Sequence, residues 1–62
     1  MNKAYEDELW LTNAYPLATI EQLDAFVERV AIKTADGISE MTARREAYVE
    51  IIESGKIKKI TL

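Results

Sequence analysis

Carboxylates are the side chains in this sequence that could take part in acid–base chemistry. The 62-residue chain has eleven Asp and Glu, eight Lys and Arg, and neither histidine nor cysteine. It therefore lacks the usual general base near neutral pH, the thiol nucleophile and the commonest zinc ligands. Catalytic carboxylates need a pocket that shifts their pKa, and two short helices can hardly enclose one. We expect no enzyme and no catalytic residue, although two groups of acids are candidates for such chemistry, Glu6-Asp7-Glu8 and Glu46, Glu50 and Glu53.

The acidic side chains also lack the spacing of a metal site. A calcium loop needs acids at alternating positions with an internal glycine, and Asp36-Gly37 alone indicates only a turn. We expect no metal and no cofactor. No unbroken apolar run is longer than Val30-Ala31-Ile32, and residues 1–8 are acidic, so the sequence predicts neither a membrane span nor an export signal. We expect a cytoplasmic protein.

Two helices are predicted from apolar spacing. Thr19-Ile20-Glu21-Gln22 has the pattern of a capping box, which predicts a helix over 19–33. A second helix is predicted over 40–54, with Gly55 placed to close it. The expected core-facing positions are Ile20, Leu23, Phe26, Val27, Val30 and Ala31 in the first helix, and Met41, Arg44, Ala47, Tyr48, Ile51 and Ile52 in the second.

The two ends of the chain complete a single, mainly α domain over 1–62. Residues 5–14 fit a third helix through apolar pairs spaced by four, or a short strand at Leu9–Thr12. Residues 57–62 are β-branched and partly alternating, which favours a short edge strand.

Surface features predict binding rather than catalysis. Glu46, Glu50 and Glu53 are spaced by three and four, so they form an acidic helical face that could dock on the basic surface of a nucleic-acid-processing enzyme. Trp10 and Tyr15 are the candidate apolar anchors. The alternatives are a solvated acidic face and, for Trp10, a place in the core. We expect a small regulator or inhibitor, of phage or mobile-element origin, that binds a protein partner.

A basic cluster supports a second hypothesis. Lys56, Lys58 and Lys59, joined by Arg44 and Arg45, could contact DNA phosphates, or the lysines could protect an edge strand from aggregation. Self-association into a homo-oligomer, with Trp10 or Ile60 at the contact, is a third hypothesis.

A family resemblance bears on the DNA hypothesis. Leu9-Trp10-Leu11-Thr12, the capped helix from Thr19 and the run 51–57 together resemble the small winged-helix domains of phage excisionases and MerR-like regulators. The resemblance implies an opening strand, a recognition helix and a wing. It also implies that Arg44, Arg45, Lys56, Lys58 and Lys59 contact DNA.

Overall fold

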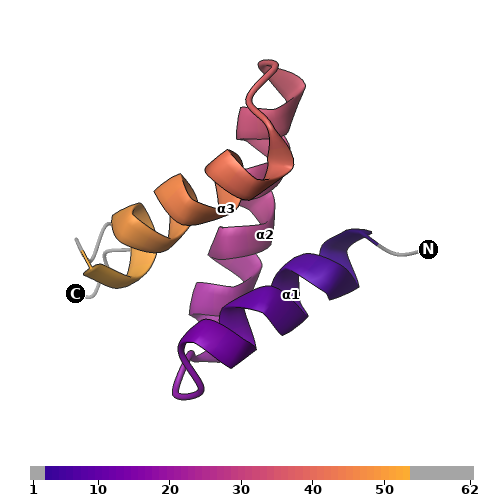
Figure 1. Ribbon diagram of the computed structural model, residues 1–62. Coiled ribbons are helices and arrows are strands. Elements are labelled where there is room, and N and C mark those ends of the chain that lie inside the picture. The colour runs from indigo at the N-terminus through magenta and orange to yellow at the C-terminus, as the bar shows by residue number, and fades with distance from the viewer. Residues whose placement is uncertain (1–2, 54–62) are drawn as a thin grey trace.

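The structure, a computed structural model, describes residues 3–53, with side chains from Ala4 onward. Within this range it contains three helices, α1 (Lys3–Ala14), α2 (Ile20–Ala35) and α3 (Glu40–Tyr48), and α3 continues into a π-helical segment, η1 (Val49–Glu53). Figure 1 shows α1 and α3 crossing the same side of α2, and both pack against it. No strand occurs among residues 3–53. The prediction of a mainly α fold is confirmed.

Helix α1 settles the two interpretations of residues 5–14 in favour of a helix. Asp7 and Leu11 are both buried and lie one turn apart, so they share the face that packs on the other helices. The strand at Leu9–Thr12, alone or as the opening strand of a winged helix, is therefore wrong. The last helical bond runs from the Tyr15 N–H to the Leu11 carbonyl at 2.7 Å, and Pro16 follows in a turn.

Helix α2 has the predicted start and a longer end. The Gln22 N–H donates to Thr19 Oγ1 at 3.1 Å and the Thr19 N–H donates to Gln22 Oε1 at 2.9 Å, which completes the capping box. The helix runs two residues past the predicted end, to Ala35. Gly37 closes it with φ +96°, and its N–H donates to the Thr34 carbonyl at 3.0 Å. This is a Schellman closure, which favours glycine because φ is positive.

Helix α3 begins after the N-cap Ser39, whose hydroxyl accepts from the Thr42 N–H at 3.4 Å. The α-helix ends at Tyr48, and the wider π-helical turn of η1 carries the chain to Glu53. The predicted continuation to residue 54, the closing Gly55 and the edge strand over 57–62 lie outside the described residues.

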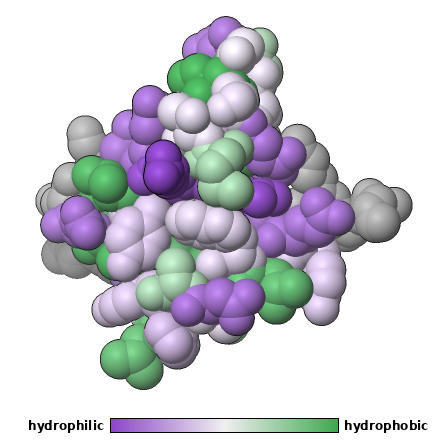
Figure 2. All heavy atoms as spheres, in the orientation of Figure 1, coloured by the Kyte–Doolittle hydropathy of each residue, from purple (hydrophilic) through white to green (hydrophobic). Residues whose placement is uncertain are grey.

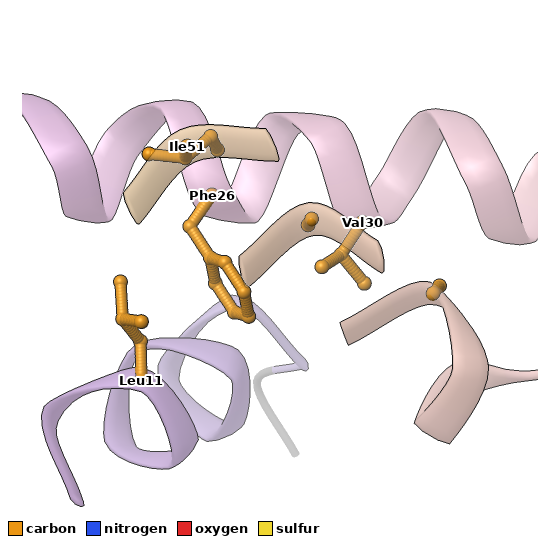
Figure 3. Packing of buried hydrophobic residues seen from close by; sticks show 6 residues of the cluster. Leu11, Phe26, Val30 and Ile51 are labelled. Atoms are coloured by element: carbon orange, nitrogen blue, oxygen red, sulfur yellow. The ribbon is translucent and has the colours of Figure 1, made fainter. Parts of the chain in front are cut away.

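The core lies where α1 and α3 meet α2. Figure 3 shows Leu11, Phe26, Val30 and Ile51 pointing into one interior, and Phe26 is its largest buried side chain. Two small residues of α3 complete the set, so that the backbone of α3 can approach α2 closely. The buried hydrophobic residues of the described chain are Leu11, Phe26, Val30, Ala43, Ala47 and Ile51.

Three predicted core positions are wrong. Ile20 is largely exposed, Ala31 is exposed and Met41 is about half exposed, whereas Ala43, which the predicted stripe omitted, is fully buried. Because Ala43 and Ala47 allow the closer approach, α3 turns their face toward α2 and leaves Met41 on the outside.

Candidate protein-binding surfaces

The acidic face predicted on the second helix is largely neutralised by bases of α2. Lys33 Nζ lies 3.1 Å from Glu46 Oε1 and 3.0 Å from Glu50 Oε2. Arg29 Nη1 lies 3.2 Å from the other carboxylate oxygen of Glu50, Oε1. This oxygen is buried and makes no hydrogen bond within the described chain. These ion pairs join α2 to α3 and η1. Glu46 and Glu50 therefore hold the helices together, and their charge is partly cancelled before a partner arrives.

The Lys33 ammonium bridges two carboxylates, and this changes its pKa. Its hydrogen bond to Glu50, and secondly that to Glu46, raise the pKa of Lys33 above the ordinary 10.5. The side chain is mostly covered, so the two bonds are partly shielded from water. Lys33 stays charged throughout the physiological range and keeps both carboxylates paired.

Glu53 differs from the other two glutamates of the predicted face. It is exposed at the end of η1, and no base of the described chain is paired with it. Of the three predicted contacts, Glu53 alone keeps an uncompensated charge among the described side chains.

The predicted aromatic anchors form one edge of the core. The Trp10 ring stacks on Phe26, with centroids 5.7 Å apart and planes 4° from parallel. It also meets Tyr48 edge-on, with a centroid distance of 6.3 Å and an angle of 82°. Trp10, Tyr15 and Tyr48 are each partly buried and pack against the buried cluster. The aromatic rings thus connect the three helices and leave only part of each ring to a partner.

Arg44 is engaged inside the protein. Its Nε donates to Asp7 Oδ1 at 2.8 Å and its Nη2 donates to Glu40 Oε2 at 3.0 Å. Only 3% of Asp7 is exposed, so this carboxylate relies on Arg44 for its neutralisation. To contact a phosphate, Arg44 would have to leave a buried carboxylate unpaired. Arg45 is exposed, and Lys56, Lys58 and Lys59 lie outside the described residues.

An exposed surface that the sequence did not single out lies on α2 and the loop before it. Leu17 is 78% exposed and Ile20 is 76% exposed, the two highest values among the large hydrophobic residues described. Asp24 and Glu28 are exposed farther along the same helix, on the side away from Phe26 and Val30. The apolar spacing of this helix is enough to place Asp24 and Glu28 on its polar side. The exposure of Ile20 was not, because its spacing matches that of the core residues.

Two open hollows mark the described surface. One of about 520 Å³ lies between the start of α1 and the end of α2, and the only acid in its lining is Asp7, which Arg44 neutralises. The other, of about 310 Å³, lies on α3 and η1 beside Val49. Neither gathers a nucleophile with a base, and no cluster of three potential metal ligands occurs within residues 3–53.

Comparison with protein-family models, curated proteins and solved structures found no match for this chain. Within residues 3–53, no helix has the length and apolar content needed to cross a membrane. The resemblance to excisionases and MerR-like regulators stays a hypothesis.

Proposed function

We propose that the protein is a non-catalytic binding module that docks on a basic protein surface through the outer face of α2. The observation that carries this proposal is the charge left over after internal pairing. All eleven acids lie within residues 3–53, together with only five of the eight bases. Three of those bases, Arg29, Lys33 and Arg44, are already paired with acids of the same chain. The charge left over on residues 3–53 is therefore strongly acidic.

The outer face of α2 offers both parts of a docking surface. Asp24 and Glu28 supply charge that would steer a basic partner and fix its orientation. Leu17 and Ile20, at the start of the helix, supply apolar area that a partner can bury. Charge alone gives little net affinity, so the adjoining apolar residues matter. This combination supports an acidic module with an apolar anchor, rather than a solvated helix face.

The partner chemistry follows from this surface. A protein that binds nucleic-acid phosphates carries a basic patch, and an acidic helix can occupy that patch in place of the phosphates. We therefore propose a regulator or inhibitor of a nucleic-acid-processing enzyme, of phage or mobile-element origin. Glu53, Trp10 and Tyr15 would lie at the margin of such a contact or outside it, whereas Glu46 and Glu50 would act by holding α3 in place.

Capture from a lysate of the source organism tests the proposal when charge-matched variants are compared. Asp24→Lys with Glu28→Lys reverses the charge of the α2 face, and Glu6→Lys with Glu8→Lys makes the same net change on α1. Wild type and the α1 variant should recover the same partner at low salt. The α2 variant should recover at least tenfold less of this partner, and it should keep the helical circular dichroism spectrum of wild type.

Two results would contradict the proposal. One is equal recovery by the α2 and α1 variants, because the captured protein would then respond only to total charge. The other is a salt-sensitive gel shift of duplex DNA by wild type, which would favour the winged-helix alternative with Arg45, Lys56, Lys58 and Lys59 as phosphate contacts. Arg44 would contribute little to such a shift, because it is held by Asp7.

A further inference from the structure

The outer face of α3 and η1 is an exposed apolar strip. Met41 and Val49 are each about half exposed and lie two turns apart, with Arg45 between them. Ala43, Ala47 and Ile51 occupy the opposite side and face the core. In Figure 2, hydrophobic residues lie among polar ones at the left, over the end of α3. Within the described chain, no helix packs on this strip.

Charges of opposite sign lie symmetrically about Val49. Arg45 precedes it by four residues and Glu53 follows it by four, so both share its side of the helix. Both are exposed, and the described chain gives neither an ion-pair partner. Eight residues separate the two, about two helical turns, which prevents them from pairing with each other.

We propose that this strip binds a second copy of the chain, with the two α3 helices antiparallel and the two-fold axis passing beside Val49. That arrangement places Arg45 of each copy opposite Glu53 of the other and brings the two Val49 side chains together. A two-fold contact must be complementary to itself, and a cation and an anion equidistant from an apolar centre meet that condition. A parallel arrangement would instead place like charges side by side.

The shape of the strip supports the same arrangement. The hollow of about 310 Å³ is lined by Arg45, Glu46, Val49 and Glu50, next to the proposed axis. A side chain of the second copy can enter it, in the manner of knobs packing into holes between helices. The chain also has a small core, and a second copy is a common way for a domain of this size to bury more apolar surface.

The proposed dimer leaves the outer face of α2 uncovered, because α3 packs against the other side of that helix. Self-association and docking on a basic partner are therefore independent, and either can fail alone. If both hold, one dimer presents two acidic faces, and its binding to a multivalent partner gains from effective concentration.

Sedimentation equilibrium with a charge-exchange set tests the dimer. Wild type should have twice the chain mass of 7.1 kDa. Arg45→Glu and Glu53→Arg should each weaken dimerisation at least tenfold, because each places like charges opposite one another. An equimolar mixture of the two variants should restore it, since every contact across the axis then joins opposite charges. Glu28→Lys, on α2, should remain dimeric.

Three results would overturn the proposal. Wild type could be monomeric at millimolar concentration, which would leave the strip to another partner. Both single variants could dimerise as wild type does, which would place the contact elsewhere. The mixture could fail to associate, which would exclude the antiparallel pairing about Val49. All the substituted side chains are exposed, and circular dichroism of each variant checks that it has folded.

Discussion

Replacing Asp7 with asparagine should destabilise the protein by much more than the small change in shape suggests. The carboxylate is 3% exposed and accepts a 2.8 Å hydrogen bond from Arg44, whose side chain is 14% exposed. Asparagine keeps the volume and one hydrogen-bond acceptor but removes the charge. The guanidinium of Arg44 would then stay largely buried with half of its neutralisation gone.

The expected magnitude follows from burial. Breaking a fully buried ion pair by removing one partner costs about 3–5 kcal/mol. Arg44 retains Glu40, and part of its guanidinium reaches water, so the loss here should be about 2–3 kcal/mol. Domains of this size have a total stability of only about 3–5 kcal/mol. The melting temperature should fall by about 10–20 °C, since each kcal/mol shifts it by roughly 4–8 °C.

Urea unfolding followed by fluorescence of Trp10 measures this loss, with all variants at one chain concentration because self-association would shift the midpoint. Glu40→Gln is the matched control, since it removes the more exposed carboxylate bound to the same guanidinium and should cost no more than about 1 kcal/mol. Asp7→Leu combined with Arg44→Leu should recover much of the stability. If the losses of stability for Asp7→Asn and Glu40→Gln differed by less than about 0.5 kcal/mol, the argument from burial would be refuted.

Two further predictions concern the end of α2. Gly37→Ala should lower the unfolding free energy, measured with urea, by about 1 kcal/mol, because a φ of +96° disfavours any side chain. The added Cβ meets no atom within 4 Å, so the backbone conformation alone sets this cost. Gly37→Asn should cost less than Gly37→Ala, and equal costs would contradict the prediction. Because the pKa of Lys33 is raised in the folded protein, the stability that its ion pairs contribute is complete below pH 10.5 and is lost as pH rises through the folded-state pKa. Arginine stays charged in this range, so the unfolding free energy of wild type should fall relative to that of Lys33→Arg above about pH 10.5. Parallel curves of unfolding free energy against pH for the two proteins would contradict this prediction.

Local features of the fold could be predicted from the sequence because they depend on residues close together in the chain. The capping box links Thr19 to Gln22, and Gly37 closes the helix through the carbonyl three residues before it. Such contacts form whichever way the helices later pack. The same applies to the apolar spacing that predicted α2 and α3, although α3 continues into a π-helical segment at Val49 that no local sequence pattern predicted.

The charged surface could not be predicted in the same way, because ion pairs join residues distant in sequence. The spacing of Glu46 and Glu50 predicts one acidic face on any helix, but their partner Lys33 lies 13 and 17 residues earlier. Arg44 finds Asp7 across 37 residues. Which acids keep an uncompensated charge is decided by helix packing, which pairs Glu46 and Glu50 with bases of α2 and leaves Asp24 and Glu28 exposed.

The bases of the described chain also explain why an acidic surface is compatible with so small a core. Arg29 and Lys33 join α2 to η1 and α3, and Arg44 joins α3 to α1, so each of these bases lies at a junction between helices. The Lys33 and Arg44 junctions each hold two acids, which would repel each other without the base between them, and a neutral residue in place of Arg44 would leave Asp7 without compensation. The junctions therefore need the bases. Acids elsewhere are free of that demand, and those on the outer face of α2 are the ones that the proposed docking contact uses.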